Sequence, residues 1–303
     1  PDYVEANYSL GIIYQDLNEL KKANKYYYKV IAIKPDLADV YFSLGTSLQK
    51  LNQLNEAINS YKKALAINSE FTEAYNNLGI AFEGLEQIDD AIKNYEKAIL
   101  TNPNYAEAHL NLGLAYQKLG QLDDSIECYK RSLTAKPDYA EAHNNLGNTF
   151  MQLGQLDKAD KSYEKAISIN SEFSLAYSNR ADVLINLKRF DEALACYQRA
   201  IDITPYKDFI LGNFLHAKMH LCIWNELSAS LILIIEKINS NQKIIKPFPL
   251  LALIDDPVIQ KKATKIFANE KYPKIQELPL LGKVLKHKKI RIGYFSADFR
   301  EHP

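Results

Sequence analysis

The chain has 303 residues, with 37 basic and 37 acidic side chains and a formal net charge of zero. This balance gives no electrostatic reason to expect nucleic acid or an anionic membrane as the main partner. No apolar run is long enough to span a bilayer. The three cysteines, Cys128, Cys196 and Cys222, match no zinc or disulfide framework, so we expect reduced thiols, no bound metal and a cytoplasmic location.

Several positions in the first two thirds of the chain recur at an interval of 34 residues. The small residues at this interval are Gly11, Gly45, Gly79, Gly113, Gly147 and Ala181. The tyrosines are Tyr27, Tyr61, Tyr95, Tyr129, Tyr163 and Tyr197. A second set of small residues comprises Ala23, Ala57, Ala91, Ser125, Ala159 and Ala193. We therefore predict an array over residues 1–207 with six repeats, at 4–37, 38–71, 72–105, 106–139, 140–173 and 174–207.

This pattern resembles the tetratricopeptide repeat, in which each unit is a hairpin of two helices. In repeat 106–139, Gly113 and Ser125 are small enough to let two helix backbones approach to about 8–10 Å. Tyr129 fills the space between hairpins, and Pro137 ends the second helix. One hairpin cannot bury its apolar face alone, so the repeats must stack. The predicted fold is all-α, a right-handed superhelical solenoid with a concave groove.

The first helix of each hairpin lines the groove in such arrays. The residue two positions before the recurring small residue is Ser9, Ser43, Asn77, Asn111, Asn145 and Asn179. A primary amide both donates and accepts hydrogen bonds, so it can pair with any peptide backbone unit. We predict that this ladder of four asparagines binds an extended peptide. The alternative is that the asparagines bridge neighbouring hairpins or cap the local backbone.

Two other kinds of site are conceivable on the same helices. A clamp for a C-terminal carboxylate needs basic residues, but the residue before each ladder position is uncharged: Tyr8, Phe42, Asn76, Leu110, Asn144 and Ser178. His109 and His143 lie one repeat apart, which suggests a metal site. Equivalent positions in adjacent hairpins are about 8–10 Å apart, whereas zinc ligands lie about 2 Å from the ion. We therefore predict that both histidines simply pack as partly buried rings.

The first three residues, Pro-Asp-Tyr, match residues 137–139 at the end of a repeat. This match leads us to expect a further hairpin before residue 1. Without that hairpin the apolar edge of the first repeat is uncovered, so we expect self-association through the exposed repeat ends.

The repeat interval stops near residue 207, and the following region, 208–285, is predicted to be a helical linker. One helix carries an apolar face from Leu211 to Ile223, and a second runs over 225–238. The prolines of residues 246–249 predict an extended stretch, after which Pro257 opens another helix. Residues 290–296 are β-branched and aromatic, which predicts one strand of a truncated α/β domain over 286–303.

Three segments of this region resemble the O-linked N-acetylglucosamine transferase family, especially its bacterial SPINDLY-type members. They are 215–224 (LHAKMHLCIW), 247–257 (PFPLLALIDDP) and 289–303 (KIRIGYFSADFREHP). The last segment is similar to the opening of the family's catalytic region, and its Asp-Phe-x-x-His-Pro end is the most specific part. The first two are similar to the segment that joins the repeats to the catalytic region.

The resemblance implies an inverting glycosyltransferase with two Rossmann-like lobes and no metal. It would transfer a sugar to Ser or Thr hydroxyls of proteins, from UDP-N-acetylglucosamine or, as in the SPINDLY proteins of plants, from GDP-fucose. His302 matches the family histidine in the active site, and the asparagines match those that contact the acceptor backbone. Ser9 and Ser43 depart from that pattern. The donor-binding lobe would lie beyond residue 303, so this chain alone is expected to be inactive and to need no cofactor.

Two functions therefore follow from the sequence. In the first, the chain is the acceptor-binding repeat region of a protein O-glycosyltransferase and holds extended segments of acceptor proteins. In the alternative, it is a non-catalytic tetratricopeptide scaffold that mediates protein–protein interactions. Residues 209–303 favour the first, because a scaffold has no need for a strand followed by Asp-Phe-x-x-His-Pro.

Overall fold

The computed structural model describes residues 3–205 and 209–271, and this part of the chain is all-helical, with no β-strand. The six repeats contain α1 (Val4–Asp16), α2 (Leu20–Ile33), α3 (Ala38–Lys50), α4 (Leu54–Ile67), α5 (Thr72–Gly84), α6 (Ile88–Thr101), α7 (Ala106–Lys118), α8 (Leu122–Ala135), α9 (Ala140–Gln152), α10 (Leu156–Ile169), α11 (Ser174–Asn186) and α12 (Phe190–Ile203). After them come α13 (Ile210–His220), α14 (Leu227–Asn239), α15 (Pro247–Leu253) and α16 (Pro257–Lys271). The predicted all-α solenoid of helical hairpins is confirmed.

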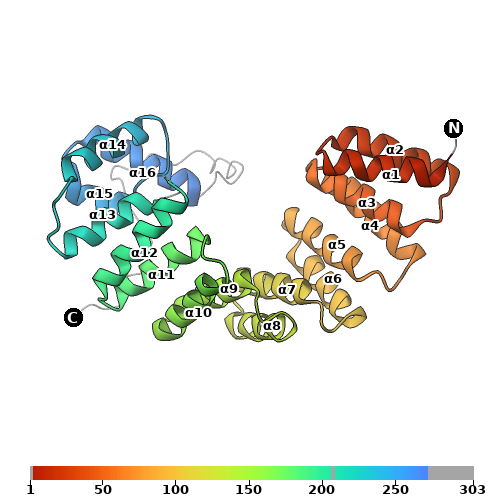
Figure 1. Cartoon of the computed structure of the whole chain (residues 1–303), viewed down its shortest axis with the longest axis horizontal. Helices are drawn as coiled ribbons and strands as arrows, with labels where there is room; N and C mark the ends of the chain where they lie inside the picture. The colour runs from red at the N-terminus through yellow and green to blue at the C-terminus, as the bar shows by residue number, and fades with distance from the viewer. Residues whose placement is uncertain (1–2, 206–208, 272–303) are drawn as a thin grey trace, which may run out of the picture.

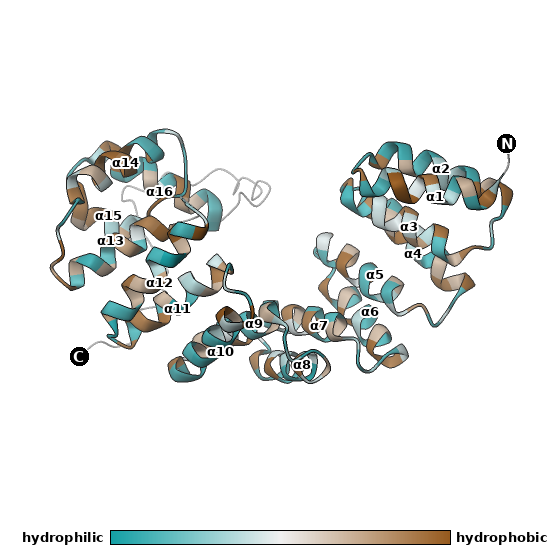
Figure 2. Cartoon of the chain, viewed as in Figure 1, coloured by the Kyte–Doolittle hydropathy of each residue, from teal (hydrophilic) through white to brown (hydrophobic). Residues whose placement is uncertain are grey.

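The hairpins stack side by side into an arc (Figure 1). In the middle of the arc α7 and α9 lie on the inner, concave side, and α8 and α10 lie on the outer side. Apolar and polar residues alternate along every hairpin (Figure 2), as expected of helices that bury one face against their neighbours. The first helices of these hairpins therefore form the concave side of the arc.

The recurring tyrosine and glycine determine how closely the two helices of a hairpin approach. The six recurring tyrosines are buried, five of them completely. A Cβ atom built on Gly113 would lie 2.7 Å from Cε1 of Tyr129, and one built on Gly11 would lie 2.4 Å from Cε1 of Tyr27. Real Cβ atoms do not approach a ring carbon so closely, so each tyrosine ring occupies the volume that a larger residue would fill.

The turn inside each hairpin is the same in all six repeats. The residue that follows the C-cap of the first helix has a left-handed backbone, at Asn18, Asn52, Glu86, Gly120, Gly154 and Lys188. Its φ is +75° at Gly120 and +60° at Lys188. This conformation is common just after a helix C-terminus, where it lets the backbone satisfy the last carbonyl groups. The second helix consequently starts at the same angle in each repeat.

The helices after the array continue its packing. α13 packs on α12 and approaches α11, as each first helix does in the repeats before it. One core cluster joins the last hairpin to α13–α16 and contains Leu184, Phe214, Ile234 and Leu250. The hydrophobic core therefore runs from the last hairpin into the helices that follow.

The expectation of an extended stretch at residues 246–249 is wrong, because α15 begins at Pro247. Proline lacks the N–H that an interior helix position needs, but the first turn of a helix has no partner for that N–H. Pro247 and Pro249 both fall within this first turn. The strand predicted at 290–296, the segment 286–303 and His302 lie outside the described residues.

Helix α1 and the residues at its two ends expose several apolar side chains, including Tyr3 (74%), Leu17 (63%) and Ile13 (51%). The self-association expected from the exposed repeat ends stays a prediction. Among the described helices, none is both long enough and apolar enough to cross a bilayer.

The contact between Gly113 and Tyr129 can be tested by a double-mutant cycle. Gly113→Ala should destabilise the fold by about 1–3 kcal/mol, because overpacking outweighs the gain in helix propensity of about 1 kcal/mol. Tyr129→Leu alone should also destabilise, because it removes buried aromatic surface. In the double variant the smaller Leu makes room for the new methyl group, so the two effects should be non-additive when measured by urea denaturation. Additive effects would show that the ring and the glycine do not constrain each other.

Candidate functional site

The predicted ladder asparagines occupy one position on four successive first helices. Asn77 lies on α5, Asn111 on α7, Asn145 on α9 and Asn179 on α11, and each is partly buried. Their helices form the inner row of the arc. The position is therefore suited to contact with a partner, and the next question is whether the amides already have partners within the array.

Two of the four asparagines bridge neighbouring hairpins. Nδ2 of Asn111 donates a hydrogen bond to Oδ1 of Asn76 at 2.9 Å, and Nδ2 of Asn179 donates to Oδ1 of Asn144 at 3.1 Å. In both pairs the acceptor lies 35 residues earlier, just before the preceding ladder position. For these two residues the structure shows the bridging arrangement that the sequence left as an alternative.

The other two asparagines cannot form this bridge. The residue 35 positions before Asn77 is Phe42, and the residue 35 positions before Asn145 is Leu110. Neither side chain has a hydrogen-bond acceptor. Oδ1 of Asn145 instead accepts a long bond of 3.4 Å from Nδ2 of its neighbour Asn144, and Asn77 has the equivalent bond from Asn76. The ladder thus alternates between asparagines that bridge to an amide of the preceding hairpin and asparagines that do not.

The ladder continues for one further position that sequence reasoning missed. Asn213 lies on α13, 34 residues after Asn179, and its Nδ2 donates to Oδ1 of Asp182 at 3.2 Å. The corresponding bond one repeat earlier joins Nδ2 of Asn179 to Oδ1 of Asn148 at 3.1 Å. The signal was present in the 34-residue interval, but residue 215, where a small residue is expected, is leucine, which obscured the register.

The hydroxyl groups of the buried tyrosines change their main hydrogen-bond acceptor along the array. In the first four hairpins the hydroxyl donates to a side chain near the end of the first helix, for example from Tyr129 to Oε1 of Gln117 at 3.0 Å. In the last two hairpins it donates instead to Asn148, at 2.7 Å from Tyr163, and to Asp182, from Tyr197. The core and the concave face are therefore linked by hydrogen bonds at this end.

Asp182 places a carboxylate where the preceding hairpin has the neutral amide of Asn148. Burial raises the pKa of the Asp182 carboxyl above its ordinary value, against the opposing influence of the Tyr197 and Asn213 hydrogen bonds and the Lys246 charge. A buried carboxyl with a raised pKa favours its protonated form. The last hairpin therefore has a titratable carboxyl group at a position where the preceding hairpin has a neutral amide.

The two histidines that recur at the repeat interval contact backbone carbonyl groups. Nε2 of His109 lies 2.9 Å from the Pro103 carbonyl oxygen, and Nε2 of His143 lies 3.1 Å from that of Pro137. The described part of the chain contains no cluster of residues able to hold a metal ion.

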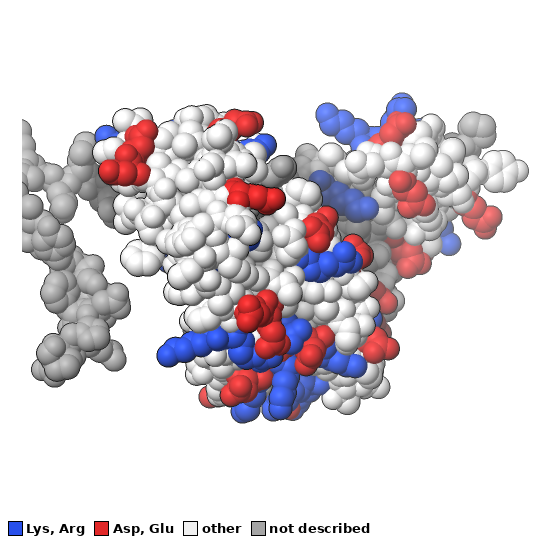
Figure 3. Space-filling view, turned by 60° about the vertical axis from the view of Figure 1, so that its left-hand side comes forward, with Lys and Arg blue, Asp and Glu red and all other residues white. Residues whose placement is uncertain are grey.

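Cys128 is buried, and burial raises the pKa of its thiol to about 11. On the face shown in Figure 3, acidic and basic side chains are interspersed.

The two classes of ladder residue should respond differently to alanine. Asn179→Ala removes bonds to Asn144 and Asn148, so it should lower the free energy of unfolding by about 1–3 kcal/mol. Asn145→Ala removes only one long bond and should change stability by less than about 0.5 kcal/mol. Urea denaturation of both variants measures the difference. Equal losses would mean that both asparagines have the same structural role.

The raised pKa of Asp182 predicts a pH-dependent stability. Because the folded state favours the protonated carboxyl, its stabilising contribution is present below the ordinary carboxyl pKa of about 4 and is lost as pH rises through the folded-state pKa. Asp182→Asn should therefore be more stable than the natural chain at pH 7, with a gap that closes towards pH 4. Asn148→Asp is the reciprocal control and should lose stability at pH 7. A gap that does not change between pH 4 and pH 8 would contradict the assignment.

Comparisons with known proteins agree with this architecture. Tetratricopeptide-repeat models match residues 4–37, 48–85, 85–120, 104–172 and 174–206. No curated protein matches the chain.

Solved structures of the same architecture include MamA, with 28% identity over 56% of this chain and 92% of MamA, and a TM-score of 0.50. The type IV pilus biogenesis factor PilW has 24% identity over 67% of this chain and 94% of its own, with a TM-score of 0.61. YrrB, described as a tetratricopeptide-repeat protein with an unusual peptide-binding site, has 24% identity over 64% of this chain and 97% of its own, with a TM-score of 0.50. The repeat interval, the stacked hairpins and these matches together place the chain in the tetratricopeptide-repeat family.

Proposed function

We propose that the concave face of this array binds extended segments of other proteins, and that the array is the acceptor-binding part of a protein O-glycosyltransferase. In this proposal the enzyme transfers N-acetylglucosamine from UDP-N-acetylglucosamine to Ser or Thr hydroxyls. The observation that carries the binding role is the alternation in the ladder, which leaves Asn77 and Asn145 outside the amide–amide bridges between hairpins.

The chemistry of these amides suits an extended chain. A peptide backbone presents one N–H and one carbonyl group per residue, and a primary amide can pair with both. Such pairing does not depend on the partner's side chains, so it fits a protein that must accept many segments. Solenoids of stacked repeats commonly use their concave surface for binding. The described peptide-binding site of YrrB is a precedent within the same fold.

The glycosyltransferase part of the proposal depends on the resemblance of segments 215–224, 247–257 and 289–303. It makes His302 an active-site residue that positions the donor or the acceptor. GDP-fucose is the second candidate donor. The donor-binding lobe would belong to a longer polypeptide that carries this chain, and this chain alone would be inactive.

A non-catalytic scaffold is the second candidate, because the alternating ladder fits both functions equally. A scaffold would bind the same extended segments without transferring a sugar. The two functions make different predictions only when a sugar donor is present.

The test uses a longer polypeptide that contains this chain, incubated with an acceptor protein and labelled UDP-N-acetylglucosamine or GDP-fucose. Transfer from one donor is expected. Asn145→Ala should raise KM about twofold to tenfold with kcat unchanged, because it removes a contact that is the same in ground state and transition state. His302→Ala should abolish transfer while leaving acceptor binding intact. Acceptor binding without transfer from either donor would support the scaffold instead.

A further inference from the structure

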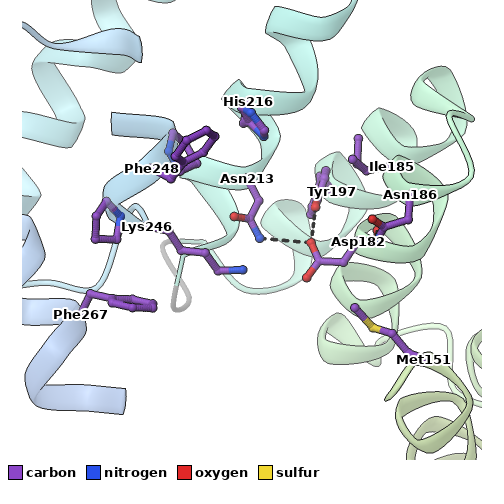
Figure 4. Close-up of a pocket in the computed structure, with 12 residues that line it drawn as sticks. Met151, Asp182, Ile185, Asn186, Tyr197, Asn213, His216, Lys246, Phe248 and Phe267 are labelled. Carbon is purple, nitrogen blue, oxygen red and sulfur yellow. Dashed lines mark hydrogen bonds between the residues drawn. The ribbon is translucent and has the colours of Figure 1, made fainter. Parts of the chain in front are cut away.

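A pocket of about 520 Å³ lies where the last hairpin meets α13, α15 and α16 (Figure 4). Its polar lining includes Asp182, Asn213 and Lys246, and its apolar lining includes Ile185 and Phe267. These residues come from α11, α13, the start of α15 and α16, which are far apart in sequence. The pocket belongs to no repeat and exists only because the C-terminal helices pack against the array.

The pocket continues the concave face. Asn213 is the fifth member of the ladder and lines the pocket. Met151 of α9 and Asp182 of α11 also line it, so three successive helices of the inner row contribute. A segment that follows the ladder towards the C-terminal end therefore arrives at this pocket.

The carboxyl group of Asp182 and the amine of Lys246 face the same opening of the pocket. Oδ1 of Asp182 accepts both the Tyr197 hydroxyl and Nδ2 of Asn213, and Oδ2 points towards the open side of the pocket (Figure 4). The Lys246 side chain extends towards the same opening, and its positive charge acts to lower the pKa of the Asp182 carboxyl. The opening thus has a hydrogen-bond acceptor on one side and a donor on the other.

A neutral group with its own donor and acceptor satisfies this arrangement best. A peptide group can donate its N–H to Oδ2 of Asp182 and accept from Nζ of Lys246 through its carbonyl. A charged side chain gains little here, because any attraction to one of the two groups is offset by repulsion from the other or by the protonation of Asp182. Charge complementarity therefore favours an uncharged backbone unit over a charged side chain.

The apolar residues in the lining of the pocket add a preference for a side chain. Phe248 and Phe267 lie on one side of the opening and Ile185 on the other (Figure 4); Phe248 is 77% exposed, and Phe267 and Ile185 are partly buried. Exposed aromatic surface next to a few polar groups is typical of a site that takes an apolar side chain. Burying that surface on a ligand would contribute to affinity in proportion to the area removed from water.

We propose that this pocket anchors one residue of the bound segment, with a bulky apolar side chain against Phe248, Phe267 and Ile185 and the adjoining peptide group between Asp182 and Lys246. The proposal rests on peptide binding by the concave face. The asparagine amides of the concave face pair with the peptide backbone of any sequence, and the pocket adds a preference for one side chain. The substrate class is therefore extended segments that carry a bulky apolar residue.

The test measures binding of fluorescent 15-residue peptides of Ser, Thr and Gly to the full chain by anisotropy. The peptides carry one central Phe, Leu, Lys or Glu, or no substitution. The Phe and Leu peptides should bind about tenfold or more tightly than the others. Phe248→Ala should remove this advantage without changing binding of the unsubstituted peptide. Lys246→Met should weaken all of the peptides, because it removes the donor to the backbone.

The matched control is Leu100→Ala, which truncates an 82% exposed apolar residue on α6 and should change nothing. Equal binding of all the peptides, or an unchanged Phe advantage in Phe248→Ala, would overturn the pocket while leaving the concave face as a binding surface. Tightest binding of the Lys peptide would show that Asp182 selects a cation and would overturn the proposal. No binding of any peptide would refute the proposed function itself.

Discussion

The rest of the structure depends on the close contact between a buried tyrosine and a residue without a side chain. In five of the six hairpins the tyrosine ring of the second helix lies where the Cβ of a larger residue would be, on the glycine of the first helix. This contact sets the distance between the two helices, and repetition of that distance sets the spacing of the hairpins. The concave face is consequently a regular surface on which one sequence position recurs at one place in space.

The same tyrosines connect the core to the concave face, and the acceptors of their hydroxyl groups change towards the C-terminal end. Their hydroxyl groups donate to Gln or Glu side chains in four hairpins, and to Asn148 and Asp182 in the last two. Because Asn148 and Asp182 also accept from ladder asparagines, a change at this end of the face affects both packing and binding groups. The ladder is thus a structural feature at some positions and a candidate binding feature at others.

Much of the fold follows from sequence patterns, and the exceptions have identifiable causes. The 34-residue interval predicted every hairpin. The residues that recur at this interval have the same packing role in each repeat, the small residues at the close approach of the helices and the tyrosines in the space between them. The prediction failed at residues 246–249, where two prolines suggested an extended chain and the structure has the first turn of α15. Proline excludes the interior of a helix but not its beginning, and the sequence does not distinguish the two.

By itself, the sequence determined the repeat, the all-helical solenoid and the identity of the residues on its inner row. Only the tertiary structure decided which asparagines bridge hairpins, because the bridge needs a polar side chain 35 residues earlier, as at Asn76 and Asn144, and fails where Phe42 or Leu110 occupies that place. It also decided that Lys246 and Phe248 line the same pocket as Asp182, which lies 64 residues before Lys246. The physical reason is that a repeat interval reveals only contacts that recur between equivalent positions of the repeats. The pocket is formed by the last repeat and by helices outside the repeats, so no sequence interval predicts it.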